Sequence, residues 1–169
     1  MPTTITVERS RTDQREALAN MAQLYIHDFT DFLRPKRIDL GDDGLYADEM
    51  RLEDYWMKAD HSVWFIRAEN KLAGFALLNR EARSGQPADF NMAQFFVTRP
   101  YRGLDVAGRA VEQLLNMHPG QWEVPIMEGN APALRFWPKA VTRARISSYE
   151  ARSQVGENPS RTLLRFVVG

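Results

Sequence analysis

The chain has 169 residues, a length typical of one domain, and 44% of them are hydrophobic, as in globular proteins. Lysine plus arginine and aspartate plus glutamate both number 22, so the chain has no net charge. We therefore expect neither a broad nucleic-acid surface nor adhesion to an anionic membrane. Cysteine is absent, which excludes disulfides, thiolate metal sites and a cysteine nucleophile.

The three histidines, His27, His61 and His118, are scattered without metal-ligand spacing, so we predict no metal site. The first residues lack the apolar segment of a signal peptide, and no apolar run approaches the ~20 residues of a membrane span. The sequence therefore predicts a single cytoplasmic domain over residues 1–169.

The N-terminal third predicts one strand and two helices. Thr4–Glu8 alternates apolar and polar residues, as a strand does. Apolar residues at spacings of three and four predict a helix from about Thr12 to Leu33, which Pro35 should end. Arg34–Gly44 is rich in turn formers and is expected to be a loop, and Leu45–Met57 is expected to be a shorter helix.

Three strands follow in the predicted order. Ser62–Ala68 and Leu72–Leu78 are expected to form a hairpin around the turn Glu69-Asn70-Lys71. After the loop Arg80–Ala88, the aromatic-rich segment Phe90–Val97 predicts the next strand.

The C-terminal half predicts strands that alternate with helices. A tight segment, Thr98–Asp105, leads into a helix that begins at Val106 and that Pro119-Gly120 breaks. The later expected elements are a strand at Gln121–Met127, a helix at Ala131–Val141, and strands at Arg143–Ala151 and Thr162–Val168 around the loop Gln154–Arg161. This order implies an α/β (α+β) fold with a mixed sheet of about seven strands flanked by about four helices.

The most informative run is Phe95–Arg109, in which a strand leads through a short turn directly into a helix. Turn amides and the first N–H groups of a helix point outward there, an arrangement that binds phosphate. Gly103 and Gly108 would let a ligand approach the backbone, and Arg102 and Arg109 add positive charge. The alternative is an ordinary strand–helix connection with surface arginines.

This run resembles motif A of the GNAT (N-acetyltransferase) superfamily, Arg/Gln-x-x-Gly-x-Gly/Ala. The matching residues are Val97, Arg99-Pro100-Tyr101-Arg102-Gly103 and Val106-Ala107. The segment Asn130-Ala131-Pro132-Ala133-Leu134-Arg135-Phe136-Trp137 is similar to the family's N-x-x-A-x-x-F-Y. The order of elements also agrees, so the resemblance covers the whole chain and implies a GNAT-type, mostly antiparallel sheet.

The resemblance implies that acetyl-CoA is the co-substrate and that no metal takes part. The turn amides would bind its pyrophosphate, and the strand near Phe96 and Val97 would bind the pantetheine arm. Asn130 and the Phe136-Trp137 pair would flank the thiol end. The implied cofactor-binding residues are Phe96, Val97, Arg102, Gly103, Leu104, Asp105, Val106, Ala107, Gly108, Arg109, Asn130, Phe136 and Trp137.

Two residues depart from the family pattern. Asp105 stands where the family has glycine, so a carboxylate would lie next to pyrophosphate, at a position where the family's glycine suggests a preference for positive φ. Asp105 would also be a good N-cap for the helix that begins at Val106. Trp137 replaces the tyrosine that commonly protonates the departing thiolate; an indole N–H only donates hydrogen bonds, so we interpret Trp137 as a packing residue.

Several residue types in the sequence could supply the catalytic groups. A backbone N–H near Phe96–Val97 could bind the oxyanion, and a carboxylate, or a water held by one, could be the base. We select Glu128, after the strand Gln121–Met127, and Tyr149, on a late strand, as catalytic candidates. Gln94 cannot take a proton, and Glu123, Asp28 and His27 are alternatives of the same standing as Glu128; the simpler interpretation of each is a solvated side chain.

The sequence predicts an N-acetyltransferase that acts by direct attack of a primary amine, from a small molecule or a peptide, in a ternary complex. Acidic residues between Arg34 and Met57 would suit a cationic amine, although a solvated face is the simpler interpretation. The alternatives are an acyl-CoA-binding relative without turnover and an unrelated α/β module that binds nucleotides or proteins. GNAT proteins are often dimers, so the resemblance leaves a homodimer open.

Overall fold

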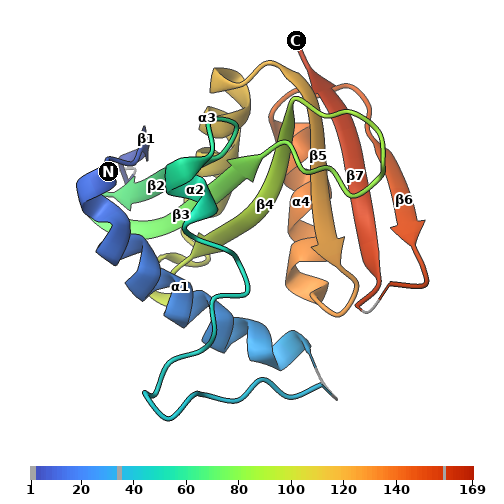
Figure 1. The fold of residues 1–169 in the computed structure, drawn as a ribbon. Coiled ribbons are helices and arrows are strands. Elements are labelled where there is room, and N and C mark those ends of the chain that lie inside the picture. The colour runs from blue at the N-terminus through green and yellow to red at the C-terminus, as the bar shows by residue number, and fades with distance from the viewer. Residues whose placement is uncertain (1–2, 34–35, 158) are drawn as a thin grey trace.

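The computed structural model describes residues 3–33, 36–157 and 159–169. Its centre is one seven-stranded sheet in the order β1-β2-β3-β4-β5-β7-β6 (Figure 1). Neighbouring strands are antiparallel except β4 and β5, which are parallel, so the expected mixed, mostly antiparallel fold is confirmed. The strands are β1 (Ile5–Arg9), β2 (Ser62–Ala68), β3 (Lys71–Asn79), β4 (Phe90–Val97), β5 (Gly120–Met127), β6 (Glu150–Gln154) and β7 (Arg161–Val168).

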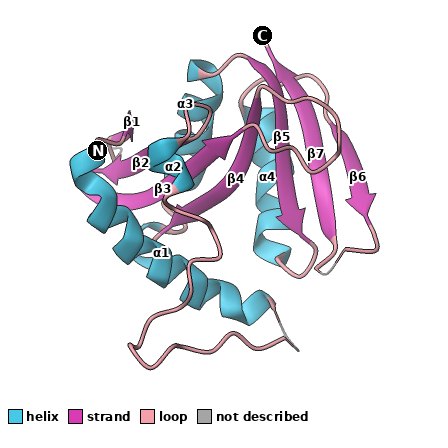
Figure 2. Cartoon of the chain, in the orientation of Figure 1, coloured by secondary structure: helices cyan, strands magenta, loops and turns pink. Residues whose placement is uncertain are grey.

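Helices cover both faces of the sheet (Figure 2). The longest helices are α1, which contacts β3 on one face, and α3 and α4, which contact each other, β1 and β5 on the opposite face. Among the described residues, no helix is both long and apolar enough to span a membrane. The helices are α1 (Arg15–Phe29), α2 (Asp54–Met57), α3 (Val106–Met117) and α4 (Ala131–Arg143), with 3-10 turns η1 (Thr12–Gln14), η2 (Thr30–Phe32) and η3 (Arg99–Tyr101).

Strand β3 is buried on both faces. Phe75 and Leu77 pack with residues of α1, whereas Ala76 and Leu78 pack with residues of α3 and α4. This alternation follows from the two-residue period of a strand. The turn before β3 places Glu69 and Asn70 at positive φ, 49° and 63°, as a two-residue hairpin requires, so the predicted hairpin is confirmed.

The first predicted helix forms in three consecutive pieces, η1, α1 and η2, because its two ends tighten into 3-10 turns. The predicted end at Pro35, and the start of the predicted loop at Arg34, lie outside the described residues.

The predicted helix at Leu45–Met57 is wrong over most of its length, because only Asp54–Met57 is helical. The Asp48 carboxylate accepts hydrogen bonds from the N–H groups of Met50, at 3.1 Å, and Leu52, at 2.8 Å. Arg51 has φ of 53°, which no α-helix accommodates. A side chain that binds local backbone N–H groups therefore competes successfully with the helix.

The predicted strand at Arg143–Ala151 is also wrong in its limits. Helix α4 continues through Arg143, Arg145 then turns the chain with φ of 61°, and the strand β6 runs over Glu150–Gln154. Strand β6 is the polar, exposed edge of the sheet, so it carries no apolar alternation that would reveal it in the sequence.

The parallel strands β4 and β5 diverge, as Figure 1 shows. They pair at only two positions, Phe90 with Trp122 and Asn91 with Glu123. Beyond these positions the sheet opens toward the C-terminal ends of both strands. In α/β sheets, ligands bind at such openings beyond the carboxyl ends of parallel strands.

Candidate functional site

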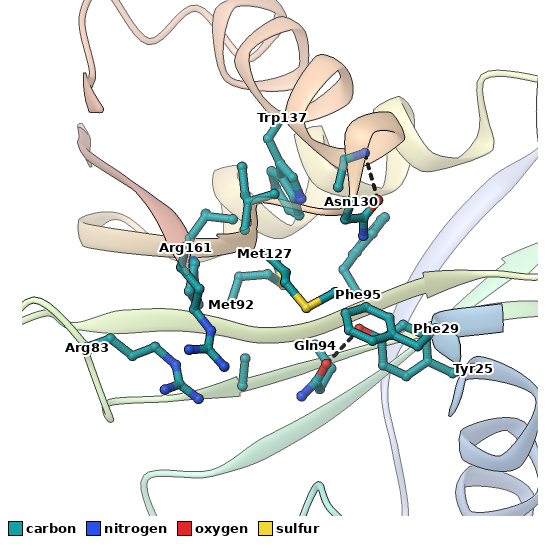
Figure 3. A pocket seen from close by; sticks show the side chains of 15 residues that line it. Tyr25, Phe29, Arg83, Met92, Gln94, Phe95, Met127, Asn130, Trp137 and Arg161 are labelled. Carbon is teal, nitrogen blue, oxygen red and sulfur yellow. Dashed lines mark hydrogen bonds between the residues drawn. The ribbon is translucent and has the colours of Figure 1, made fainter. Parts of the chain in front are cut away.

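A cavity lies between the diverging halves of β4 and β5 (Figure 3). Gln94 and Met127 contribute side chains from the two strands, Tyr25 closes one end, and Arg83 and Arg161 lie at the other end. This space, called the central cavity below, is lined by Tyr25, Phe29, Arg83, Met92, Ala93, Gln94, Phe95, Val124, Pro125, Ile126, Met127, Asn130, Ala133, Trp137 and Arg161.

A second hollow, called the outer groove below, continues from the central cavity toward α3. If Gly129 carried a Cβ, that atom would lie only 2.7 Å from the Phe32 carbonyl oxygen. Glycine at this position therefore lets η2 pack closely against the turn after β5, where it forms one side of the outer groove. The two spaces share Tyr25, Phe29, Phe95, Asn130, Ala133 and Trp137. The outer groove is further lined by Asp28, Asp31, Phe32, Phe96, Val97, Arg99, Arg102, Ala107, Pro132 and Phe136.

Strand β4 contains a bulge where it borders the central cavity. Leu77 of β3 faces Gln94 and Leu78 faces Met92, so Ala93 has no partner on β3. A bulge redirects the following side chains and bends the strand, and bulges are common beside active sites. The bulge therefore lies just after the last residue of β4 that pairs with β5, where the two strands begin to diverge.

Backbone groups of β4 face the opening at alternate residues. The Thr98 N–H donates to the Ala73 carbonyl of β3 at 2.8 Å. Because successive residues of a strand point their backbone groups to opposite sides, the backbones of Val97 and Phe95 face the opening. The Val97 carbonyl accepts a hydrogen bond from Arg102 Nε at 2.8 Å. The backbone N–H and carbonyl of Phe95 therefore remain for a ligand at this edge of β4.

The turn between β4 and α3 has the geometry of an anion site. Gly103 has φ of 77° and Asp105 has φ of 61°, so the chain turns sharply into the helix. The first intrahelical hydrogen bond joins the Arg109 N–H to the Asp105 carbonyl at 3.2 Å. The N–H groups of Val106, Ala107 and Gly108 therefore have no intrahelical partner, as expected at a helix N-terminus.

Asp105 occupies the N-cap position, but the prediction that it caps the helix is wrong, because its side chain makes no capping hydrogen bond. Its carboxylate instead receives a hydrogen bond from Arg143 Nη1 on α4. A Cβ on Gly108 would lie 2.8 Å from this carboxylate, so the ion pair crosses the helix directly over a glycine. Arg143 thus pairs with the acidic residue of the turn, and both side chains remain about half exposed.

The two arginines of the motif are engaged by the protein itself. Arg102 donates to Asp28 and lies over the ring of Phe96, at 5.6 Å from its centroid. Partial burial alone would raise the pKa of Asp28, but the hydrogen bonds and the charges of Arg102 and Arg99 together outweigh it and lower this pKa. Arg109 donates to the Thr3 carbonyl at the start of the chain. Arg102 therefore borders the outer groove, whereas Arg109 does not line it.

The second sequence motif forms the opposite wall. Asn130 caps α4, since its Oδ1 accepts a hydrogen bond from the Ala133 N–H at 3.1 Å. Trp137 is 5% exposed, and no described residue accepts a hydrogen bond from its indole N–H. Its ring packs edge-on against Phe95 at 5.4 Å and against Phe136 at 5.3 Å. Trp137 is thus a packed wall of both spaces.

The groove brings together seven of the residues selected from the sequence, Phe96, Val97, Arg102, Ala107, Asn130, Phe136 and Trp137. The others selected in the turn and helix, Gly103, Leu104, Asp105, Val106, Gly108 and Arg109, lie beside this groove without lining it.

The two catalytic candidates lie away from both spaces. Glu128 is exposed at the end of β5 and accepts a hydrogen bond from Ser153 of β6 at 2.7 Å. Tyr149 is 40% exposed and immediately precedes β6, the outermost strand. Neither residue lines the central cavity or the outer groove.

The alternatives to these two candidates are held in other interactions. Glu123 is fully buried in an ion pair with Arg165, and His27 contacts the Tyr46 hydroxyl at 2.9 Å. Gln94 accepts a hydrogen bond from the Tyr25 hydroxyl at 2.7 Å, and burial raises the pKa of Tyr25. In the parts of the chain that the structure describes, no three His, Cys, Asp or Glu side chains gather as metal ligands.

Sequence reasoning missed Tyr25, Arg83 and Arg161, which line the central cavity. Tyr25 is one of many apolar-face residues of α1, and its spacing indicates only that it points inward. Arg83 belongs to a loop and Arg161 to a strand 78 positions later in the sequence. No local motif connects these two arginines, and only the sheet order places them together.

Comparison with known structures supports the fold. The chain is similar to the GNAT domain of S. lividans PAT, with 13% identity, coverage of 99% of this chain and 94% of that chain, and a TM-score of 0.66. It is similar to spermidine N-acetyltransferase from Vibrio cholerae in complex with CoA and spermine, with 9% identity, coverage of 97% and 95%, and a TM-score of 0.63. It is also similar to Arabidopsis thaliana Naa50 in complex with the bisubstrate analogue CoA-Ac-MVNAL, with 13% identity, coverage of 95% and 97%, and a TM-score of 0.60.

At these identities the likeness to solved structures establishes the fold, and the family rests on the sequence. A search of curated protein sequences finds no significant match. The sequence model of the acetyltransferase (GNAT) family matches residues 19–141, which is most of the chain. The resemblance inferred from the two motifs is thereby confirmed, and the chain belongs to the acetyltransferase (GNAT) family.

Proposed function

We propose that the protein transfers an acetyl group from acetyl-CoA to a primary amine, by direct attack while both substrates are bound. The observation that carries this proposal is the continuous path from the turn at Gly103–Gly108, along the outer groove, to the central cavity. One end of this path suits a phosphate, and the other end offers room for an acceptor. CoA and an acceptor, or an analogue joining the two, are bound in the related structures of the spermidine acetyltransferase and Naa50.

The residues present fit coenzyme A. The N–H groups of Val106, Ala107 and Gly108 would hold the pyrophosphate, at the positive end of the α3 dipole. The backbone of β4 at Phe95 would hold the pantetheine arm, and Trp137 would flank the thiol end. The positive φ of Asp105 is the conformation for which the family's glycine at this position is suited. Acetyl-CoA supplies the acetyl group as a thioester.

The protein's own contribution would be positioning and hydrogen bonding. Holding two reactants in contact can supply much of the acceleration of such a reaction. The Phe95 N–H faces the opening and can donate a hydrogen bond to a carbonyl oxygen. Tyr25 stays a neutral donor because burial raises its pKa, and it fixes Gln94. No carboxylate among the described residues lines the central cavity, so the amine would arrive neutral or lose its proton to water.

The test combines binding with turnover. We expect acetyl-CoA to raise the melting temperature of the purified protein, because a ligand that binds only the folded state stabilises it. Pantetheine, which lacks the pyrophosphate, should raise it less. With a broad panel of primary amines, at least one should release free thiol from acetyl-CoA. Stabilisation without thiol release would identify a CoA-binding protein without turnover, and no stabilisation would reject the CoA site.

Substitution of Asp105 should tighten CoA binding. Asp105→Asn keeps the tolerance for positive φ while it removes the negative charge beside the proposed pyrophosphate site. By the usual size of charge effects at a helix end, we expect the dissociation constant for CoA in calorimetry to fall by about twofold to fivefold. Asp105→Gly should behave in the same way.

Asp105→Ala is the matched control, because alanine also lacks the charge but disfavours positive φ. It should unfold at lower temperature than Asp105→Asn, by a difference of roughly 1–2 kcal/mol in stability. Weaker CoA binding by a folded Asp105→Asn protein would mean that the turn does not hold the pyrophosphate.

A further inference from the structure

The far end of the central cavity is positively charged. Arg83, from the loop between β3 and β4, and Arg161, the first residue of β7, are its two charged lining residues among those described. Figure 3 shows their guanidinium groups at the end opposite Tyr25 and Phe29. The rest of the lining is apolar or uncharged, so the charge at this end is not balanced by an acid within the cavity.

A single carboxylate, that of Glu157, lies near both arginines, and it does not line the cavity. Glu157 lies 3.1 Å from Arg161 Nη1 and 3.9 Å from Arg83 Nη1, and the second distance is too long for a hydrogen bond. Among the described residues, Arg161 donates only through Nη1, to Glu157 and to the Pro159 carbonyl. Burial, and then the charge of Arg83, lower the pKa of Arg161, but a guanidinium stays protonated near neutral pH. One net positive charge and several N–H donors therefore remain.

A buried ion pair holds Arg83 in place. Glu123 is fully buried on β5, where it accepts hydrogen bonds from the N–H groups of Arg83, at 2.6 Å, and Ser84, at 3.3 Å. Its other oxygen pairs with Arg165 at 2.7 Å. The carbonyl of Arg83 accepts from Gln154 Nε2 at 3.1 Å. Burying a carboxylate is costly, and here its hydrogen bonds fix the backbone of the residue that charges the cavity.

The acidic groups near the charged end line an adjoining hollow and not the central cavity itself. An adjoining hollow shares Arg83 and Gln94 with the central cavity and is lined by Glu49 and Glu81. Glu81 pairs with Arg51 at 2.6 Å, and Lys58 lies 3.6 Å from it. Of the acids expected from the sequence to attract a cationic amine, Glu49 lines the adjoining hollow. The others line neither the central cavity, nor the adjoining hollow, nor the outer groove; they are Asp39, Asp42, Asp43, Asp48, Glu53 and Asp54.

We infer that the acceptor is a primary amine that also carries an acidic group, a carboxylate or a phosphate, which Arg83 and Arg161 bind. This inference rests on the proposed acetyl transfer and specifies its substrate. Guanidinium groups bind both kinds of anion through paired N–H donors. With the anion at the arginine end, the amine of the acceptor would point along the cavity toward Phe95 and Trp137, where the outer groove enters.

The test uses pairs of amines that differ only in the acidic group. Each of a series of α- and ω-amino acids is compared with its carboxamide, and phosphoethanolamine with ethanolamine, by thiol release from acetyl-CoA. We expect the acidic member of at least one pair to have the higher kcat/KM, by about tenfold to a hundredfold, the usual effect of hydrogen bonds to a charged group. The amino-acid and phosphoethanolamine pairs show which anion is preferred.

Arg83→Gln and Arg161→Gln should each reduce that preference severalfold or more, mainly through KM of the acidic amine, and should leave KM for acetyl-CoA nearly unchanged. Arg152→Gln is the matched control, because Arg152 is an exposed residue of β6 that pairs with Glu150 and lines neither space. It should keep the wild-type preference. Preference for the neutral member of every pair, or a preference that survives in both variants, would overturn the inference and leave acetyl transfer standing.

A binding measurement separates this inference from the proposed function. If no amine releases thiol, the same pairs are titrated into the protein saturated with CoA. Binding of the acidic member that Arg83→Gln and Arg161→Gln abolish would support the anion site and reject turnover. Equal binding of both members, or binding of neither, would reject the anion site.

Discussion

Glu123→Ala is expected to destabilise the protein by about 3–5 kcal/mol, because it leaves the side chain of Arg165 without its buried partner. Glu123 is fully buried, the side chain of Arg165 is 11% exposed, and their ion pair is 2.7 Å long. The same change removes the acceptor for the N–H groups of Arg83 and Ser84. Urea unfolding of both proteins, analysed with a common m-value, measures the difference.

Two variants separate the ion pair from the packing around it. Glu123→Gln keeps the shape and one acceptor but turns an amide N–H toward Arg165, so we expect a smaller but still clear loss. The double variant Glu123→Leu with Arg165→Met removes both charges, and it should be more stable than Glu123→Ala, because matched apolar residues often replace buried ion pairs with little loss. A Glu123→Ala protein as stable as wild type would show that the loop is held by other contacts.

Glu123→Gln also has an expected effect on selectivity. The negative charge of Glu123 strengthens the hydrogen bond that fixes the backbone of Arg83, and Glu123→Gln keeps this bond without the charge. A folded Glu123→Gln protein should therefore prefer acidic amines less strongly than wild type. KM for acetyl-CoA should change little, because Glu123 lines neither the central cavity nor the outer groove. Unchanged amine preference would indicate that the loop keeps its conformation without the negative charge of Glu123.

Most of the sheet could be predicted from the sequence, because its strands carry their own periodic signals. Ser62–Ala68 and Phe90–Val97 were predicted with the limits that the structure has, and the strand of Leu72–Leu78 extends by one residue at each end. The failures lie where another interaction decides the conformation. Asp48 binds nearby N–H groups and prevents a helix, and β6 forms because it pairs with β7 rather than because of its own residues.

The same distinction applies to the candidate site. The turn that ends at Asp105 is contiguous in sequence, so its glycine, its helix start and its departure from the family pattern could be recognised together. The central cavity is assembled from distant segments, and its arginines become neighbours only because β7 pairs with β5. Glu128 follows the correct strand, but its side chain contacts Ser153 on the far side from the cavity, and strand position alone does not give that direction.

Trp137→Phe is expected to keep most of the activity, because it removes an indole N–H that no described residue accepts and a small part of a packed ring. The family often has a tyrosine at this position, and loss of a general acid typically lowers a rate by ~10²–10⁴. A thiol has a pKa near ~8.5, so a thiolate can depart near neutral pH without an acid. Trp137→Tyr, if it packs, should therefore leave thiol release unchanged or raise it.

Trp137→Ala should instead damage folding, because truncation of a buried aromatic side chain costs about 3–5 kcal/mol. Trp122→Phe is the matched control for loss of an indole. Trp122 is fully buried away from both spaces, and its N–H donates to the His118 carbonyl at 2.8 Å, so this variant should lose stability but keep its rate per folded molecule. The measurement is the steady-state rate of thiol release for each variant beside its melting temperature. A stable Trp137→Phe protein with a rate reduced a thousandfold would show that the Trp137 N–H takes part directly in the reaction, and the assignment of Trp137 to packing would be wrong.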